Sequence, residues 1–295
     1  MERLSGIIQR FHDKKILVIG DLMLDKFISG NFTRISPEAP VPIVDVENEE
    51  YDLGGAANVA SNISTLGGNV IIFGFRGEDS QGEILESLLA QRNIKHFLGI
   101  NSKTTLKERV IMSQQGRKQQ FLRIDYDEPS IKIFSSELKS ELMKEAASAD
   151  MIVISDYAKG VITSDLMGCL SEFKHKIIVD PKPKNSALYK GVYLITPNDR
   201  EALGMAAQED VFEAGKKLKN DLISNILITR GHKGMALFSD KLFEVQAQAQ
   251  NAYDVVGAGD TVIAALALAL SAGASLEDAT IIANYAAGIA VSKAG

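Results

Sequence analysis

Short runs of β-branched and other apolar residues alternate along this chain with longer amphipathic stretches. The short runs predict strands, apolar on both faces, at residues 15–19, 69–75, 151–155, 176–180, 192–196, 226–229 and 235–239. The longer stretches predict helices at residues 56–66, 81–92, 136–147, 164–173, 211–224, 259–271 and 276–291. This alternation is typical of an α/β fold in which helices flank both faces of a mainly parallel central sheet.

Two segments interrupt the alternation. Residues 27–53 contain three prolines and an extended, alternating pattern, and residues 104–126 have the pattern of a hairpin that turns at residues 114–117. Because no helix is predicted within either segment, we expect them to form a small separate sheet. The apolar face of such a sheet needs a cover, either the active site or a second subunit. A lid over the site is the functional interpretation, and an edge hairpin that completes the main sheet is the simpler alternative.

The composition narrows the class of protein. With 295 residues, 45% of them hydrophobic, the chain can form one large α/β domain or two smaller ones. A net charge of −6 argues against a nucleic-acid-binding surface, and the single cysteine, Cys169, excludes an internal disulfide. The N-terminus lacks the apolar core of a signal peptide, and the longest apolar run, residues 262–270, is far short of the roughly 20 residues that span a bilayer. We therefore expect a cytoplasmic protein without nucleic-acid or membrane partners.

The most informative segment is Asp254-Val-Val-Gly-Ala-Gly-Asp260, which runs directly into the predicted helix that holds this apolar run. Its two glycines let backbone N–H groups converge, and the helix adds the positive end of its dipole, which predicts a phosphate-binding loop. A carboxylate repels bound phosphate, so the presence of Asp260 suggests a base that accepts a proton from an attacking hydroxyl. The alternative is a glycine turn in which Asp260 only caps a buried helix.

Polar residues at two other places suit a polyol, because ligands of such sheets bind beyond the carboxyl ends of the strands. The first predicted strand leads into Asp21 and Asp25, and paired carboxylates accept hydrogen bonds from neighbouring hydroxyls. Gly54 and Gly55 allow close backbone approach to a ligand, and Asn58 offers both a donor and an acceptor. The alternatives are a turn aspartate with a surface salt bridge, and small residues that only pack a helix on the sheet.

Asn198 and Glu201 stand three residues apart at a predicted helix start, on one face of that helix. Two hard oxygen ligands in this position suit Mg²⁺ that is bound largely through water. The same pair also matches a capping box, with Asn198 as the N-cap and Glu201 at N3. The two interpretations are compatible.

In combination, these motifs make the chain resemble the ribokinase-like, PfkB-type carbohydrate kinases over essentially its whole length. The resemblance rests on the order of Gly20-Asp21, Gly54-Gly-Ala-Ala-Asn58, Thr196-Pro-Asn198-x-x-Glu201, Thr229-Arg-Gly231 and Asp254-x-x-Gly-Ala-Gly-Asp260. Within the family, residues 34–42, 54–60 and 155–160 resemble the kinase domain of the bacterial heptose enzymes. The resemblance implies ATP-dependent phosphorylation of the anomeric hydroxyl of D-glycero-β-D-manno-heptose 7-phosphate, which gives the 1,7-bisphosphate for ADP-heptose and lipopolysaccharide core synthesis.

The resemblance also implies roles for single residues. Asp260 is expected to be the base, and the N–H groups of Gly257, Ala258 and Gly259 are expected to form the anion hole for the transferring γ-phosphoryl group. Asn198 and Glu201 are expected to position Mg²⁺ and phosphates. The remaining expected roles are nucleotide contacts and contacts with sugar hydroxyls: Thr229, Gly231 and Asn284 for the nucleotide, and Asp21, Asp25, Gly54, Gly55 and Asn58 for the sugar.

A phosphorylated sugar needs its own cationic partners, preferably arginines, because their fork matches phosphate oxygens. The basic candidates in and beside the two interrupting segments are Arg34, Lys107, Arg109, Arg123 and Lys159, and we favour Arg34 and Arg123 because they lie in the predicted lid.

The expected cofactors are ATP and Mg²⁺, and the loop around Asp254 and Val256 is a possible site for a monovalent cation. We expect residues 1–295 to form one kinase domain without a nucleotidyltransferase domain, and a homodimer that pairs through the lid. Two other functions stay open. One is another sugar or nucleoside kinase of the same fold. The other is a non-catalytic sugar- or nucleotide-binding regulator, against which an intact Asp260 argues.

Overall fold

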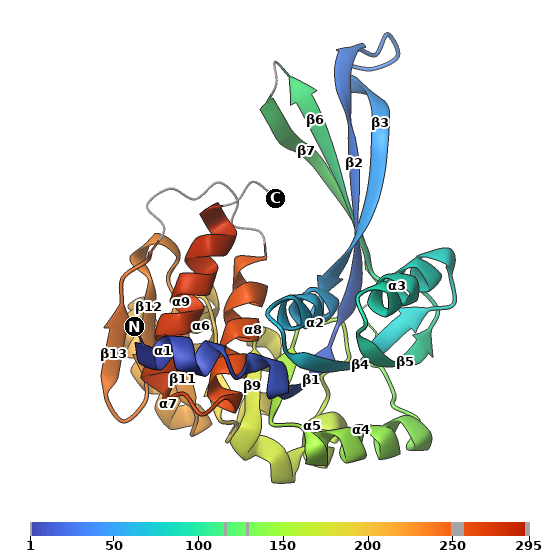
Figure 1. The fold of residues 1–295 in the computed structure, drawn as a ribbon. Helices are drawn as coiled ribbons and strands as arrows, with labels where there is room; N and C mark the ends of the chain where they lie inside the picture. Colours follow the sequence, from blue (N-terminus) through green and yellow to red (C-terminus); the bar gives the residue numbers. More distant parts are fainter. Residues whose placement is uncertain (1, 115–116, 128–129, 249–256, 293–295) are drawn as a thin grey trace.

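A nine-stranded sheet forms the body of the protein in this computed structural model, which describes residues 2–114, 117–127, 130–248 and 257–292 (Figure 1). Seven neighbouring strands of this sheet pair in parallel: β5 (Lys95–Asn101), β4 (Asn69–Gly77), β1 (Lys15–Gly20), β8 (Met151–Ser155), β9 (Ile177–Asp180), β10 (Leu194–Ile195) and β11 (Asn225–Thr229). Two antiparallel strands continue it, β12 (Met235–Phe238) and β13 (Leu242–Val245). The predicted mainly parallel sheet is therefore confirmed.

Helices cover both faces of this sheet and create two separate cores. One face is covered by α1 (Glu2–Ile8), α2 (Ala56–Thr65), α3 (Ser80–Gln91), α8 (Ala258–Ser271) and α9 (Leu276–Ser292). The other is covered by α4 (Ser136–Ser148), α5 (Ser164–Cys169), α6 (Asp199–Ala206) and α7 (Val211–Leu222). The predicted α/β fold with helices on both faces is also confirmed.

The sequence of β1 shows why both faces are needed. Ile16 and Val18 point into one core, while Leu17 and Ile19 point into the other, and all four are fully buried. A strand surrounded by apolar contacts on both sides must be apolar at every position, because successive side chains alternate between the faces. The same alternation operates in β8, so the continuous apolar runs in the sequence are the central strands.

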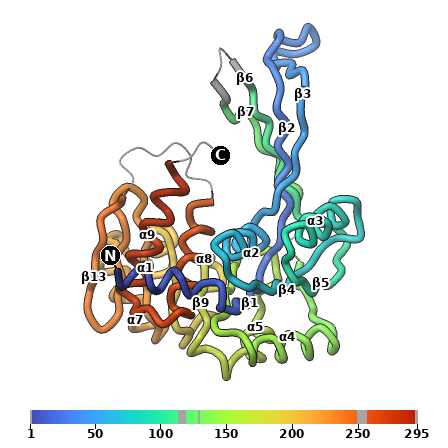
Figure 2. Tube along the Cα trace, in the orientation of Figure 1, coloured from blue at the N-terminus to red at the C-terminus, as the bar shows by residue number. Residues whose placement is uncertain are grey.

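A second, four-stranded sheet stands out from the body (Figures 1 and 2). It consists of two antiparallel hairpins, joined by parallel pairing of β2 with β6: β2 (Leu22–Ile35) with β3 (Pro42–Gly55), and β6 (Leu106–Gln114) with β7 (Arg117–Tyr126). We call it the projecting sheet. The two segments that interrupt the alternation thus form a separate sheet, as predicted, and the edge-hairpin alternative is wrong.

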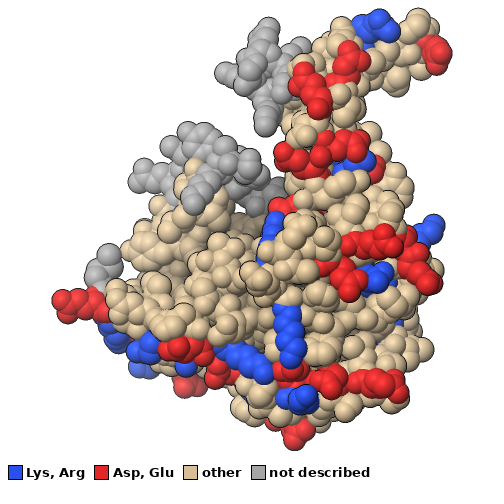
Figure 3. Space-filling model, turned by 45° about the vertical axis from the view of Figure 1, so that its right-hand side comes forward, with Lys and Arg blue, Asp and Glu red and all other residues tan. Residues whose placement is uncertain are grey.

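Charged and apolar side chains share the surface of the projecting sheet. Figure 3 shows acidic side chains along it. Four acidic residues of β3 are exposed: Asp45, Glu47, Glu49 and Glu50. Several large apolar side chains of the same sheet are also exposed to between 36% and 54%: Phe32, Ile35, Val46, Phe121, Leu122 and Ile124. Its outer part therefore buries little apolar area within this chain.

The structure also corrects the predicted elements. Strands β5 and β13 and helix α1 lie where the pattern predicts no element, α6 begins at the helix start predicted from Asn198 and Glu201, and β10 is only two residues long. The predicted helix at residues 164–173 divides into α5 and a 3₁₀ turn, Ser171–Lys176. Among the described residues, no helix is long and apolar enough to cross a membrane.

Candidate active site

The carboxyl ends of four body strands surround a polar cavity of about 270 Å³. Its lining comes from the loop after β8, from the ends of β9, β10 and β11, and from the start of α8: Tyr157, Asp180, Lys182, Thr196, Asn198, Glu201, Thr229, Gly257, Gly259, Asp260 and Val262. This is the edge at which a parallel α/β sheet presents its ligand site.

Asp260 lies in the first turn of α8 and is held from two sides. The Nδ2 group of Asn58 on α2 donates to Oδ2 at 2.6 Å, and the hydroxyl of Tyr157 donates to Oδ1 at 3.0 Å. Only 8% of the residue is exposed. Because each carboxylate oxygen has more than one lone pair, both hydrogen bonds leave room for a ligand hydroxyl.

Burial raises the pKa of Asp260 above its usual range, and the negative charge of Asp25 adds to the rise. The hydrogen bonds from Asn58 and Tyr157 and the positive charge of Lys107 oppose it. A carboxylate with a raised pKa is a stronger proton acceptor than an ordinary aspartate, provided that it stays ionised at the working pH.

The predicted anion hole lies at the start of α8. Gly257 is the N-cap in the left-handed conformation, with φ of 76°, and within the described part of the chain no side chain caps the helix. The N–H groups in the first turn of this 14-residue helix therefore lie at its cavity end, and no described side chain accepts a hydrogen bond from them. Asp254 and Val256, the predicted monovalent cation site, lie outside the described residues.

Asp180, Lys182 and Glu201 form the charged wall of the cavity. Lys182 Nζ pairs with Glu201 Oε1, and Glu201 and Asn198 form the predicted capping box through two hydrogen bonds of 3.0 Å. Burial raises the pKa of Asp180 well above its usual range, and the charge of Asp260 raises it further. Burial alone would lower the pKa of Lys182, but the hydrogen bond and the charge of Glu201 raise it.

These oxygens fit Mg²⁺ that is held mainly by water and phosphates. Both Glu201 oxygens already accept a hydrogen bond, and among the described residues no cluster of three or more acidic, His or Cys side chains could enclose a metal. Asp180 is the carboxylate of this wall whose charge is least compensated. Mg²⁺ usually keeps several waters and takes one or two carboxylates, so the set is suited to a metal that arrives with a nucleotide.

Asp21 is buried, and its carboxylate accepts hydrogen bonds from the loop that follows β8. Its Oδ2 accepts the N–H groups of Tyr157 and Lys159 at 2.8 and 3.1 Å, and its Oδ1 accepts that of Val161 at 3.2 Å. The carboxylate thus fixes the loop that carries Tyr157. Asp21 therefore positions this loop, and its expected contact with sugar hydroxyls stays a prediction.

Asp25 lies near the start of β2, where the projecting sheet joins the body; we call this part the root of the sheet. Its carboxylate, unlike that of Asp21, has an oxygen without a hydrogen bond among the described residues. Its Oδ1 lies 2.8 Å from Nη1 of Arg109, but these two buried atoms lack the geometry of a hydrogen bond, and neither has a hydrogen-bond partner in the part of the chain that the structure describes. A Cβ atom on Gly54 would lie 2.9 Å from the carboxylate of Asp25, so this glycine leaves space beside it. Gly55 has φ of 55° and turns the chain into α2. Because this ion pair leaves the hydrogen-bonding capacity of both atoms unused among the described residues, a polar ligand can supply hydrogen bonds here.

The predicted phosphate-binding residues divide into two groups. Lys107, Arg109 and Arg123 share one face of the β6–β7 hairpin, where Arg109 is opposite Arg123. Arg123 is held by Asp125 through two hydrogen bonds of 2.9 and 3.0 Å, and Lys159 pairs with Asp127.

Arg34 lies nine residues beyond Asp25 on β2, on the exposed outer part of the projecting sheet. At roughly 3.3 Å per residue this places it about 30 Å away. Within this chain it is therefore remote from the cavity.

The predicted nucleotide residues are also separated. Thr229 ends β11 and lines the cavity, and Gly231 follows it in an exposed turn with φ of 54°. Asn284 is buried in α9, where its Nδ2 donates to the carbonyl of Gln246 at 2.7 Å, so it anchors the segment after β13.

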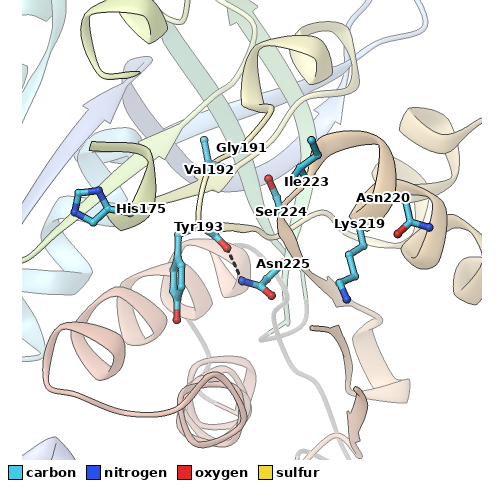
Figure 4. Close-up of a pocket in the computed structure, with 9 residues that line it drawn as sticks. All are labelled: His175, Gly191, Val192, Tyr193, Lys219, Asn220, Ile223, Ser224 and Asn225. Atoms are coloured by element: carbon cyan, nitrogen blue, oxygen red, sulfur yellow. Dashed lines mark hydrogen bonds between the residues drawn. The ribbon is translucent and has the colours of Figure 1, made fainter. Parts of the chain in front are cut away.

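A larger cleft of about 510 Å³ lies at the opposite, amino edge of the sheet (Figure 4). It is lined by His175, Gly191, Val192, Tyr193, Lys219, Asn220, Ile223, Ser224 and Asn225. Asn225 donates to the carbonyl of Tyr193 at 2.9 Å, and no carboxylate belongs to this lining. Size alone therefore does not identify the site, whereas the charges at the carboxyl edge do.

Tyr157, Asp180 and Lys182 are parts of the site to which the sequence analysis assigned no role. Tyr157 follows β8, Asp180 ends β9 and Lys182 follows β9, and the topology brings them to Asp260, some 80 to 100 positions later in the chain. Their place directly after predicted strands was the available signal, because strand ends line the ligand edge of such a sheet.

The sequence of this chain is similar to those of known carbohydrate kinases. The family described as pfkB family carbohydrate kinase matches residues 13–295. The bifunctional protein HldE of Haemophilus ducreyi is 40% identical over 296 aligned residues, which cover 97% of this chain and 62% of that protein. The D-beta-D-heptose 7-phosphate kinase of Bordetella bronchiseptica is 39% identical over 297 aligned residues, which cover 97% of this chain and 94% of that protein.

The fold also matches solved structures. Phosphofructokinase-2 from Escherichia coli, in complex with potassium, has a TM-score of 0.77 at 22% identity, with coverage of 96% of this chain and 94% of that one. A ribokinase from Arabidopsis thaliana, complexed with ribose and ATP, has a TM-score of 0.74 at 22% identity, with coverage of 96% and 94%. The chain spans about three fifths of the length of the bifunctional relatives that it matches.

Proposed function

This chain belongs to the pfkB family of carbohydrate kinases, and we propose that it transfers the γ-phosphoryl group of ATP to the anomeric hydroxyl of D-glycero-β-D-manno-heptose 7-phosphate. The relatives named as heptose 7-phosphate kinase and HldE support this substrate, because their similarity extends over 97% of the chain. The proposal concerns the part of those relatives that this chain matches.

The observation that carries the proposal is the position of Asp260. A buried carboxylate lies in the first turn of a helix whose N–H groups are capped by no side chain of the described residues, at the carboxyl edge of the sheet. A phosphate-binding helix start gains nothing from an adjacent carboxylate unless that carboxylate removes a proton. This combination is what phosphoryl transfer to a hydroxyl requires.

In the proposed reaction the anomeric oxygen attacks the γ-phosphorus while Asp260 accepts the hydroxyl proton. The bond between the γ-phosphorus and the bridging oxygen breaks, and ADP leaves with that oxygen. The N–H groups of Gly257, Ala258 and Gly259 would stabilise the charge on the transferring group. Mg²⁺ would be held near Asp180, Asn198 and Glu201, mainly through water, and would neutralise phosphate charge.

The sugar would lie between the root of the projecting sheet and α8. Asp25, whose Oδ1 is paired with Arg109 but accepts no hydrogen bond from the described residues, and the space beside Gly54 support contacts with sugar hydroxyls. Lys107 and Arg109 on β6 lie beside Asp25 and are our candidates for the 7-phosphate, with Arg123 across the hairpin. Gly55 and Asn58 shape the entry to α2, and Thr229, Gly231 and Asn284 would serve the nucleotide side.

We further propose that the projecting sheet covers the sugar and pairs across a homodimer. The exposed apolar residues on its outer part, Phe32, Ile35 and Phe121 among them, support a second copy as the cover. In that arrangement Arg34, remote from its own site, would be available to the partner. We propose one kinase domain over residues 1–295 that acts in the cytoplasm, where ATP is supplied.

The experiment is a substrate panel assayed by ATP-dependent ADP release. The panel contains the heptose 7-phosphate, the unphosphorylated heptose, fructose 6-phosphate, ribose and adenosine, each with and without Mg²⁺. We expect the heptose 7-phosphate to have the highest kcat/KM and the unphosphorylated heptose to lose most of it through KM. Equal use of the unphosphorylated heptose would refute the heptose-phosphate assignment, and preference for another sugar or nucleoside would replace it.

A further inference from the structure

We propose that Tyr157 is a positioning residue for the base: its phenol fixes the Asp260 carboxylate in the orientation that accepts the sugar proton. The inference rests on the proposed function, since it requires Asp260 to act as a base.

The carboxylate is held by two donors that come from different parts of the fold. Asn58 on α2 donates to Oδ2 at 2.6 Å, and Tyr157, in the loop after β8, donates to Oδ1 at 3.0 Å. Rotation of the carboxylate about its Cβ–Cγ bond would break both hydrogen bonds. Without Tyr157 one oxygen loses its donor, and the group gains freedom at the point where an error of about 1 Å lowers the rate strongly.

Tyr157 is itself held in place by three neighbours. Its backbone N–H donates to Asp21 Oδ2 at 2.8 Å. The ammonium groups of Lys107 and Lys182 lie over its ring, 5.2 and 5.4 Å from the ring centre. Such cation–π contacts fix the ring plane and therefore the direction of the phenol. Lys107 belongs to the projecting sheet, so the ring also connects that sheet to the base.

The charged groups around the pair determine its protonation. Asp25 on β2, Lys107 on β6 and Asp180 at the end of β9 face it, together with Lys182 beyond β9. Burial, followed by the charge of Asp260, raises the pKa of Tyr157 well above its usual range, so the phenol stays protonated and remains a donor. Its hydrogen bond lowers the pKa of Asp260, and loss of that bond must raise the pKa.

The test compares full-length Tyr157→Phe with the wild type in kcat, KM and pH profile, with heptose 7-phosphate and ATP as substrates. Phenylalanine keeps the ring and its lysine contacts and removes only the hydroxyl. We expect kcat to fall by roughly ten- to a hundredfold, KM for ATP to stay within about twofold, and the acid limb of kcat/KM to move to higher pH. Tyr193→Phe is the matched control, because it removes a phenol from the cleft at the amino edge and should change none of these.

A thermal melt checks that Tyr157→Phe folds. If it does not, 3-fluorotyrosine at position 157 keeps the shape but is a stronger donor, and it should move the acid limb to lower pH. Wild-type kcat together with an unmoved acid limb in either variant overturns the proposal. Asp260→Asn separates the two levels: if it is inactive while Tyr157→Phe behaves as wild type, only the role of Tyr157 fails, and if Asp260→Asn stays active, the proposed function fails as well.

Discussion

A buried carboxylate lies at each edge of the parallel sheet, and the surroundings shift the pKa values of the two in opposite directions. At the amino edge Glu145 accepts hydrogen bonds from Lys15 and Lys95, both at 2.7 Å, and these bonds lower its pKa. At the carboxyl edge burial raises the pKa of Asp260, and no salt bridge to this carboxylate is present among the described residues.

The difference separates a structural charge from one available for chemistry. Glu145 is surrounded by its own counterions, so its charge is satisfied by the fold alone. Asp260 has neutral donors, while Asp25 and Asp180 add negative charge around it. A carboxylate without a salt bridge beside a helix start that no described side chain caps is incomplete without ligands, which is the condition expected of a catalytic centre.

The largest effect should follow from removing the base at the carboxyl edge. We expect Asp260→Asn to fold, to bind ATP and to lose at least about 10² to 10⁴ in turnover, because asparagine keeps the shape of the side chain and one accepting oxygen but cannot accept a proton. Steady-state kinetics with a melting control measures this. Retention of more than a tenth of the wild-type turnover would remove Asp260 from the mechanism.

The next effect should come from the cations on the projecting sheet. Arg109→Gln should raise KM for the sugar phosphate by roughly ten- to a hundredfold, the equivalent of one charge-assisted contact, and leave KM for ATP nearly unchanged. The parallel variant Arg34→Gln distinguishes an intrachain site from a shared one. A large KM increase for Arg34→Gln alone would assign the phosphate to the partner subunit and contradict the placement at Arg109.

A smaller change is expected from Glu201, in the charged wall of the cavity. Glu201→Gln keeps the capping hydrogen bond, because the amide oxygen still accepts from the N–H of Asn198, but it removes a charge. The Mg²⁺ concentration for half-maximal rate should rise roughly tenfold. An unchanged metal dependence would reduce Glu201 to its capping role.

The smallest kinetic effect should come from the amino edge. Glu145→Gln should lower the free energy of unfolding by about 1–3 kcal/mol and leave kcat within about twofold. Because the folded-state pKa of Glu145 is lowered, its stabilisation is present above the pKa of an unfolded glutamate and is lost as pH falls through the folded value. Urea unfolding of both proteins at neutral and acidic pH measures this. A kcat loss of tenfold with unchanged stability would contradict the contrast between the two edges.

The central strands and most helices could be predicted from the sequence because burial on both faces leaves a continuous apolar signal. Edge strand β5 was missed because its side chains are only partly buried and its sequence, Lys-His-Phe-Leu-Gly-Ile-Asn, carries polar residues and a glycine. Helix α6 has eight residues, too few for a clear period, although its capping pair was identified.

For the site, the motif residues were predictable but their partners were not. Asp260 and Asn58 were singled out separately, and the hydrogen bond between them joins two helices that are 202 residues apart. Tyr157 acquires its position only when β8, β6 and α8 meet, which no local pattern encodes. Asp21 was predicted as a sugar ligand from its place after the first strand, whereas its hydrogen bonds to the N–H groups of the loop after β8 join positions 136 to 140 residues apart, which no local pattern encodes.

The central claim is that the site at the carboxyl edge of the sheet transfers a phosphoryl group from ATP to the anomeric oxygen, with Asp260 as the base. The direct measurement is ³¹P NMR of heptose 7-phosphate incubated with ATP and Mg²⁺, with the wild type and with Asp260→Asn in parallel. The wild type should produce one new phosphomonoester coupled to the anomeric proton, with one ADP for each, and Asp260→Asn should produce neither. A new phosphate on another carbon, or the same product from Asp260→Asn at a comparable rate, would contradict the account.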